Sequence, residues 1–182
     1  MVSVYLCRRQ ECSTDALVTE LAKKYFPGTV PEILRAGRGK PYFAGDTGIH
    51  FSVSHSGDYV AVAFAKFPVG LDLQQHKSRS YETRTETHAR HKKLAARYFH
   101  PDEQALVEKD PWEGFFRVWT AKESFVKRTG QGIDKVFSKI CILPQGESWE
   151  DANGFFRQAE IPDGYTLTLS ALHATQWEIL TL

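Results

Sequence analysis

Short stretches in which apolar and polar residues alternate predict much of this chain as β-strands. In the first 75 residues the alternation predicts strands at 2–6, 49–54, 59–66 and 69–74. Residues 14–26 instead carry apolar side chains at helical spacing, and Ser13 before them is a suitable N-cap. Residues 31–48 are rich in Gly and Pro and are predicted to be mostly loop.

The remainder of the chain begins with helical patterns and ends with strands. Helices are predicted at 87–99, 101–109 and 113–128. Strands are then predicted at 137–143, 154–157, 165–172 and 177–182. Each half therefore runs from a strand through helix to antiparallel strands, with a join near residue 68, which indicates an α+β fold.

The segment 69–74 places two oxygen donors side by side. Its apolar residues alternate and share one face of the predicted strand. Asp72 and Gln74 therefore lie together on the opposite face, one pleat apart. Oxygen donors are the ligands that hard metal ions such as Mg²⁺ prefer.

The helix predicted at 113–128 places charge beside an apolar stripe. At 100° per residue, one stripe contains Phe115, Val118, Trp119, Phe125 and Val126. Lys122 falls in the middle of this stripe and Glu123 at its edge. A charge against an apolar surface is costly unless it has a partner such as an ion or a phosphate. The two segments together therefore predict a site for a hard metal and an anionic substrate.

Composition narrows the classes of function. The 182 residues are 42% hydrophobic and 25% charged, as in ordinary soluble globular proteins. The net charge of +1 argues against a general nucleic-acid binder. Cys7, Cys12 and Cys141 have neither zinc-site nor disulfide-framework spacing, which predicts reduced thiols. Because no signal pattern or membrane-length apolar run is present, we expect a cytoplasmic protein outside the membrane.

Four motifs resemble those of one enzyme family. They are Gly39-Lys40-Pro41, Phe51-Ser52-Val53-Ser54-His55-Ser56, Gly70-Leu71-Asp72 and Trp119-Thr120-Ala121-Lys122-Glu123-Ser124. In their order and rough spacing, between residues 37 and 132, they resemble the 4′-phosphopantetheinyl transferases of the Sfp type, in the holo-acyl-carrier-protein synthase superfamily. Enzymes of this family transfer the phosphopantetheine arm of coenzyme A to a serine of a carrier protein.

The resemblance implies a fold and a reaction. The fold would be a pseudo-dimer of two similar α+β lobes, here 1–67 and 68–182, each an antiparallel sheet packed with helices. The active site would lie in the cleft between the lobes. In the implied Mg²⁺-dependent reaction, a serine of an acyl- or peptidyl-carrier protein attacks the β-phosphate of coenzyme A and 3′,5′-ADP leaves. We expect the protein to be a monomer.

The resemblance also assigns catalytic and metal-binding residues. Asp72 and Glu123 match magnesium ligands, with the coenzyme A pyrophosphate completing the coordination. Gln74 is a departure, because many Sfp-type enzymes carry glutamate there; its amide oxygen can still bind the metal, but we expect lower affinity. Glu123 is also a candidate to accept the serine proton, and Lys127 matches a lysine close to the pyrophosphate. Lys122 is expected to direct its charge at phosphate or a neighbouring carboxylate.

The earlier motifs carry the expected coenzyme A contacts. His55 matches a ligand of the 3′-phosphate, and Lys40 matches a contact to the adenine and the 3′-phosphate. Pro41, Ser54 and Arg38 complete the expected set. Ser54 and His55 are not a nucleophile and its base, because neighbours on an extended chain point to opposite faces.

The stretch 76–93 is a candidate docking surface. It holds six Lys and Arg residues against two Glu residues, and carrier proteins are generally acidic around the modified serine. We therefore expect it to steer the carrier electrostatically, with a solvated loop as the alternative. Two other functions remain open. One is a non-catalytic paralogue that binds carrier or coenzyme A and lost its metal through Gln74; the other is a metal-dependent nucleotide-phosphate hydrolase.

Overall fold

The computed structural model describes residues 1–9, 13–35, 39–132 and 137–182, which form a mixed α+β structure. The strands are β1 (Val2–Arg8), β2 (Ile33–Arg35), β3 (Pro41–Phe43), β4 (His50–Ser56), β5 (Tyr59–Ala65), β6 (Gly70–Gln75), β7 (Ser148–Asp151), β8 (Gly154–Ile161), β9 (Tyr165–Ala171) and β10 (Trp177–Thr181). The helices are α1 (Thr14–Ala22), α2 (Arg84–Tyr98), α3 (Pro101–Lys109) and α4 (Glu113–Thr129).

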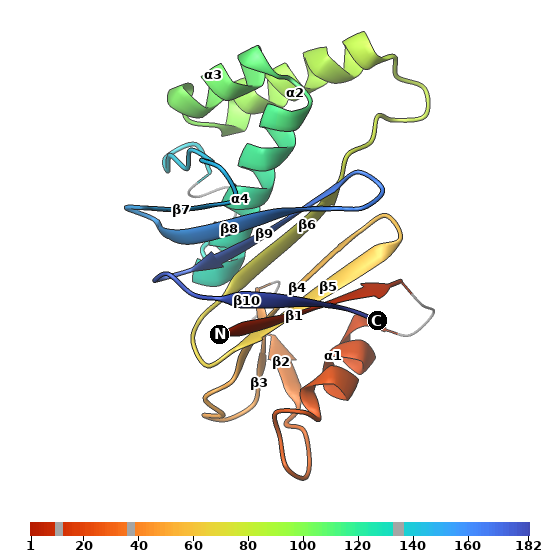
Figure 1. Cartoon of the computed structure of the whole chain (residues 1–182), viewed down its shortest axis with the longest axis vertical. Coiled ribbons are helices and arrows are strands. Elements are labelled where there is room, and N and C mark those ends of the chain that lie inside the picture. Colours follow the sequence, from red (N-terminus) through yellow and green to blue (C-terminus); the bar gives the residue numbers. More distant parts are fainter. Residues whose placement is uncertain (10–12, 36–38, 133–136) are drawn as a thin grey trace.

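Most of these strands belong to two four-stranded sheets. One has the order β10-β1-β5-β4 and the other the order β6-β9-β8-β7, while β2 and β3 pair separately. All pairings are antiparallel except that of β1 with β10, which is parallel. The last strand therefore joins the sheet that the first strand begins, as Figure 1 shows.

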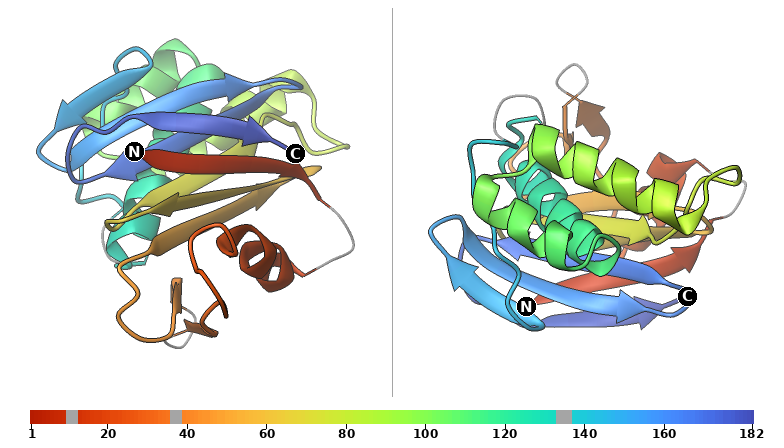
Figure 2. Two further views of the ribbon diagram at one scale, coloured as in Figure 1. Left: turned by 60° about the horizontal axis from the view of Figure 1, so that its bottom comes forward. Right: turned by 90° about the horizontal axis from the view of Figure 1, so that it is seen from above.

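The two sheets face each other and helices cover their outer sides (Figures 1 and 2). Apolar residues of β1 and β5 share a core with those of β6 and β9 between the sheets. On the other side of the first sheet, α1 packs against β1, β4 and β5. On the other side of the second sheet, α4 packs against β6 and β9, with α2 and α3 beyond it. The layers thus run from α1 through two sheets to α4.

The predicted helix and strand patterns are largely present, with shifted ends. The helix predicted at 14–26 ends at Ala22, and Ser13 caps it as expected, accepting from the Ala16 N–H at 3.2 Å. The loop predicted at 31–48 contains the short pair β2 and β3. In the described part of the chain, no helix combines the length and apolar character needed to cross a bilayer.

The strand predicted at 137–143 is wrong. Residues 137–147 form turns and irregular backbone, and the strand β7 follows instead. The reason is visible in the partners of this segment. The Ile140 carbonyl accepts from Lys122 and the Ile142 N–H donates to Glu103, so buried side chains take up backbone groups that a strand ladder would need.

Candidate active site

Alternate serines of β4 connect it to β6, although the two strands are the edges of different sheets. Ser52 Oγ accepts from the Leu71 N–H at 2.9 Å, and Ser56 Oγ accepts from the Gln75 N–H at 2.9 Å. Hydroxyl groups thus satisfy backbone donors of β6 that would otherwise need a neighbouring strand. The alternating serines of the motif at 51–56 therefore join β4 to β6 along one side of the two facing sheets.

Gly70 lets α4 approach β6 closely. A Cβ atom at Gly70 would lie 1.9 Å from the Ser124 carbonyl oxygen and 2.5 Å from the Arg128 backbone nitrogen, both on α4. Any side chain would therefore push the helix away from the strand. The glycine of the Gly-Leu-Asp motif is what allows side chains of α4 to meet those of β6.

Lys127 of α4 meets Asp72 of β6 and Ser54 of β4 at this junction. Its ammonium group donates to Asp72 Oδ1 at 2.7 Å and to Ser54 Oγ at 2.8 Å. Ser54 Oγ in turn donates to the same Asp72 oxygen at 2.9 Å. Side chains from β4, β6 and α4 therefore converge on one carboxylate oxygen.

The other oxygen of Asp72 has no partner in the described part of the chain. Asp72 Oδ2 is buried and makes no hydrogen bond within the described residues. Glu123, one turn before Lys127, likewise has no hydrogen bond to its carboxylate there. Burial and the charge of Asp72 raise the pKa of Glu123 to about 7, while Lys127 opposes the shift. Two carboxylates thus share a partly buried space with one lysine.

A buried carboxylate oxygen without a partner, beside a second carboxylate whose pKa is raised, is energetically unfavourable in the absence of a cation. Hard divalent ions take carboxylate oxygens as ligands. The residues present therefore fit a Mg²⁺ ion, and Asp72 and Glu123 are the side chains that would hold it.

Lys122, by contrast, lies away from this cluster. It is fully buried and donates to Glu103 Oε1 and Oε2 at 2.8 and 2.7 Å and to the Ile140 carbonyl at 2.7 Å. Of the two partners expected for Lys122, the neighbouring carboxylate is the one present, and Glu103 supplies it from α3.

Comparison with known proteins adds independent evidence. The profile of the 4′-phosphopantetheinyl transferase superfamily matches residues 68–169, more than half of the chain. The chain belongs to this superfamily. A 4′-phosphopantetheinyl transferase of Bacillus subtilis is 28% identical over 146 residues, or 74% of this chain. The 4′-phosphopantetheinyl transferase Sfp of Bacillus subtilis strain 168 is 28% identical over 159 residues, or 79% of this chain.

A further relative, the 4′-phosphopantetheinyl transferase psf-1 of Bacillus pumilus, is 36% identical over 101 residues, which is 53% of this chain. The chain spans less than two thirds of these curated relatives: the matches cover 60%, 64% and 39% of their lengths.

Lys40 of the Gly-Lys-Pro motif is half-buried near the start of β6. Its ammonium group donates to the Val69 carbonyl at 2.6 Å. Burial and the charge of Arg128 lower the pKa of Lys40 to about 8. Pro41 follows as the first residue of β3. Arg38, also expected at the coenzyme A site, lies outside the described residues.

His55 lies elsewhere, on the opposite face of β4 from Ser54. It is exposed and borders a cavity of about 450 Å³ together with Arg8 and Arg9. Lys40 lies near the other end of β4, where burial and the Lys40 charge lower the pKa of His50. Five residues of strand span about 16 Å. The structure therefore does not bring Lys40 and His55 to one point.

Gln74 lies on the same strand face as Asp72, as predicted, but its side chain has different neighbours. It borders a cavity of about 290 Å³ with residues of the stretch 76–93 and with Leu94 and Trp119. Its amide donates only weakly, to the Gln75 carbonyl at 3.5 Å. Gln74 thus lies between the carboxylate cluster and the basic stretch.

The basic stretch is less uniformly available than its sequence indicates. Arg90 donates to Glu82 at 3.0 Å, and Lys92 pairs with Glu108 at 2.5 Å. Arg79 lies 3.8 Å from Glu82. Within the described residues, the cations of this stretch without an ion pair are Lys77, Arg84 and Lys93.

Sequence reasoning missed two sets of residues. Glu103 has a recognisable signal, because an acidic residue three positions after the N-cap favours a capping box, and its side chain does accept from the His100 N–H. Arg8 is the last residue of β1 and Arg9 follows it, and no sequence pattern links either residue to His55. They come beside His55 because β5 pairs with β1 on one side and with β4 on the other.

Proposed function

We propose that this chain transfers the 4′-phosphopantetheine arm of coenzyme A to a serine of an apo acyl- or peptidyl-carrier protein and releases 3′,5′-ADP. The observation that carries the proposal is the convergence of Asp72, Glu123 and Lys127 on one centre in a chain of this superfamily. Unsatisfied carboxylates beside a lysine suit a reaction at a metal-bound pyrophosphate.

Asp72 and Glu123 are the proposed ligands of Mg²⁺, and the amide oxygen of Gln74 completes the set directly or through a water. When bound, Mg²⁺ neutralises charge on the pyrophosphate and polarises its phosphorus–oxygen bonds. Gln74 in place of a carboxylate leaves one negative charge fewer for the metal.

The chain's own residues supply the remaining steps. The serine oxygen of the carrier forms a bond to the β-phosphorus, and the bond from that phosphorus to the bridging oxygen breaks. Glu123 accepts the serine proton, and the bridging oxygen leaves with the two electrons as part of 3′,5′-ADP. Lys127 lies where its ammonium group stabilises the charge that grows on the leaving phosphate.

Coenzyme A is proposed to cross the edge of β4. His55 is proposed to bind the 3′-phosphate, because Arg8 and Arg9 border the same cavity as His55. Lys40, with Pro41, Arg38 and Ser54 as the other proposed contacts, then meets a different part of the nucleotide, since Lys40 and His55 lie at opposite ends of the strand.

The carrier is proposed to dock on the surface that borders Gln74. Lys77, Arg84 and Lys93 supply positive charge for an acidic partner, and Leu94 and Trp119 supply apolar contact. Charge of this kind raises the rate of encounter and weakens with salt.

The active site is proposed to lie in the cleft between two lobes, 1–67 and 68–182, with β10 returning to the sheet of the first lobe. The serine bonds between β4 and β6 support a junction at this point. A monomer in the cytoplasm is the proposed working form.

The test is an incubation of the purified chain with coenzyme A, Mg²⁺ and a panel of apo carrier proteins, followed by intact mass. Addition of one phosphopantetheine group to a carrier, dependent on Mg²⁺ and on the carrier serine, is expected. Cleavage of coenzyme A without any carrier would instead indicate a hydrolase. Binding of coenzyme A with no transfer to any carrier would indicate a non-catalytic paralogue.

A further inference from the structure

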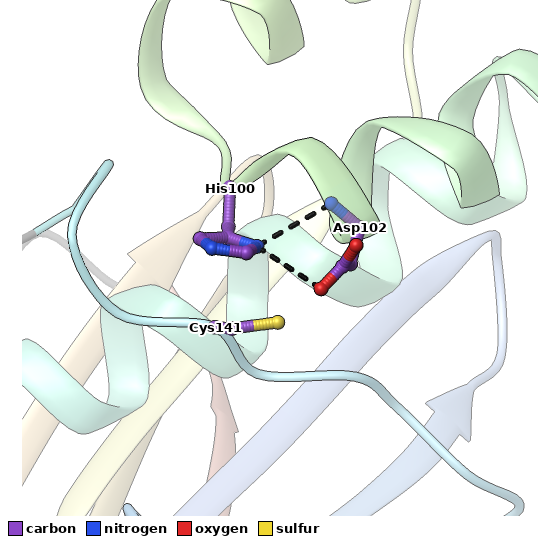
Figure 3. Close-up of side chains that lie close together, drawn as sticks. All are labelled: His100, Asp102 and Cys141. Atoms are coloured by element: carbon purple, nitrogen blue, oxygen red, sulfur yellow. Dashed lines mark hydrogen bonds and ion pairs between the residues drawn. The ribbon is translucent and has the colours of Figure 1, made fainter.

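Three side chains of the types that can bind metals lie close together at the start of α3, away from the carboxylate cluster. His100, Asp102 and Cys141 each offer one ligand atom, and these atoms lie within 4.8 Å of one another. In Figure 3 the imidazole, the carboxylate and the thiol point into one common space. His100 and Asp102 come from the N-terminal end of α3, whereas Cys141 comes from a segment about forty residues later in the chain.

Buried bonds hold both sides of this cluster in place. Glu103 accepts from the His100 N–H and from the Ile142 N–H, each at 2.7 Å. Lys122, paired with Glu103, donates to the Ile140 carbonyl at 2.7 Å. The fully buried Lys122–Glu103 pair therefore anchors the backbone of His100 and the backbone on either side of Cys141.

A third anchor fixes Cys141 itself. The Asn153 side-chain amide donates to the Cys141 carbonyl at 2.7 Å. The thiol and the imidazole are half-buried and Asp102 is exposed, so the space between them is reachable from solvent. The backbone on both sides of the cluster is thus held by hydrogen bonds, and the space between the side chains is open to an ion.

The donor set selects a class of metal. One imidazole nitrogen, one thiolate sulfur and one carboxylate oxygen form a mixed set that suits Zn²⁺ and disfavours Mg²⁺, which takes oxygen ligands. Three protein ligands leave a fourth tetrahedral position for water. This cluster shares no residue with the proposed magnesium site.

We propose that His100, Asp102 and Cys141 form a second metal site, which binds Zn²⁺ and joins the start of α3 to the segment at 140–142. Binding replaces the thiol proton, which passes to solvent, with a sulfur–metal bond. The weak contacts of the imidazole with the Asp102 N–H at 3.3 Å and the Asp102 carboxylate at 3.4 Å give way to the metal.

The first experiment titrates the metal-free full chain with Co²⁺, whose bond to a thiolate gives a charge-transfer absorption in the near ultraviolet. Wild type is expected to develop this band at one equivalent of Co²⁺, and Zn²⁺ but not Mg²⁺ is expected to remove it. Cys141→Ser should abolish the band. A wild-type chain without the band, or a band that persists in Cys141→Ser, overturns the proposal.

Further variants separate the three ligands from folding effects. His100→Asn removes the imidazole but keeps a good N-cap, and Asp102→Asn keeps the side-chain shape; each is expected to weaken Co²⁺ binding at least tenfold. Cys7→Ala and His173→Asn are the matched thiol and imidazole controls and should leave the titration unchanged. Equal weakening in ligand variants and controls would overturn the site.

A second readout uses stability. An ion that binds only the folded chain raises its melting temperature in proportion to the logarithm of its concentration. Zn²⁺ should therefore raise the melting temperature of wild type and of Asp72→Asn equally, and should not raise that of Cys141→Ser. An increase lost in Asp72→Asn would place the zinc at the active site and overturn the proposal.

Discussion

Lys122 and Lys127 lie five residues apart on α4, and each binds a carboxylate from another element. The side chains of Lys122 and Glu103 are fully buried, and both Glu103 oxygens accept hydrogen bonds from Lys122. The Lys127 side chain is 28% exposed, and one oxygen of Asp72 has no partner among the residues that the structure describes. The helix α4 thus carries a completed ion pair (the closed pair, Lys122 and Glu103) and an incomplete one (the open cluster around Lys127 and Asp72).

The difference separates a structural role from a chemical one. Burial raises the pKa of Glu103 and lowers the pKa of Lys122, and each charge opposes the shift of the other. A closed pair of this kind fixes a fold, because all its bonds are used within the chain. An open cluster keeps bonding capacity for a ligand, and a bound cation would relieve its unfavourable charge in the free protein.

The largest expected effect tests the closed pair. Lys122→Met leaves Glu103 buried without its counter-charge and should lower the free energy of unfolding by about 3–5 kcal/mol. Lys127→Met should lower the free energy of unfolding by less than half as much, because Lys127 is partly exposed and Asp72 keeps its hydrogen bond from Ser54. Urea unfolding measures both. The double variant Glu103→Gln/Lys122→Met should recover much of the loss; equal losses in the two single variants would contradict the comparison.

The open cluster should respond in activity rather than stability. Asp72→Asn removes a charged metal ligand and should lower the rate of phosphopantetheine transfer at least about 100-fold. The free energy of unfolding should stay within about 1 kcal/mol of wild type. Asp58→Asn, at an exposed turn, is the control and should transfer normally. Near wild-type turnover of Asp72→Asn at all Mg²⁺ concentrations would refute the metal assignment.

The pH dependence of Glu123 gives a finer test. Its pKa rises from an ordinary 4.5 to about 7, so between these values the folded chain binds more protons there than the unfolded chain. Its contribution to stability is therefore present below pH 4.5 and lost as the pH rises through 7, by roughly 3 kcal/mol. Wild type should lose this stability relative to Glu123→Gln, and Mg²⁺ should restore it at pH 8. If the stabilities of wild type and Glu123→Gln change with pH in parallel without metal, the pKa of Glu123 is not raised.

A substitution at Gln74 tests the proposed metal ligands of the open cluster. Gln74→Glu adds a carboxylate on the same strand face as Asp72 and should lower the Mg²⁺ concentration for half-maximal transfer several-fold. Gln75→Glu, which faces the other way, is the matched control. A weaker response to Mg²⁺ in Gln74→Glu would mean that the amide has a specific role.

The smallest effect concerns the basic stretch. Lys93 has no ion pair within the described residues, so Lys93→Glu should raise the KM for the carrier a few-fold at low salt and hardly at 1 M salt. The KM for coenzyme A should not change. Lys109→Glu, outside the stretch, is the charge-matched control. An equal rise at all salt concentrations would indicate damage to α2 instead.

The sequence by itself predicted the local structure well where one pattern dominated. Strict alternation gave β4 and β6, and the helical stripe gave α4, because burial of one face requires that periodicity whatever the neighbours are. The motifs likewise brought the chain to its superfamily and singled out Asp72 and Glu123. At 137–143 the apolar residues predicted a strand, yet Lys122 and Glu103 take up its backbone groups, a long-range bond that periodicity does not record.

Only the tertiary structure decided which charges are partners. Lys122 and Lys127 look alike in the sequence, and it is the packing of α3 on one and of β6 on the other that makes the first closed and the second open. Packing also separates Lys40 from His55, and it joins Cys141 to His100 although their spacing resembles no metal motif. The physical reason is common to all three. Periodicity fixes which face a residue occupies, whereas a charge or ligand atom acts through contacts a few ångströms long, which only the assembled layers provide.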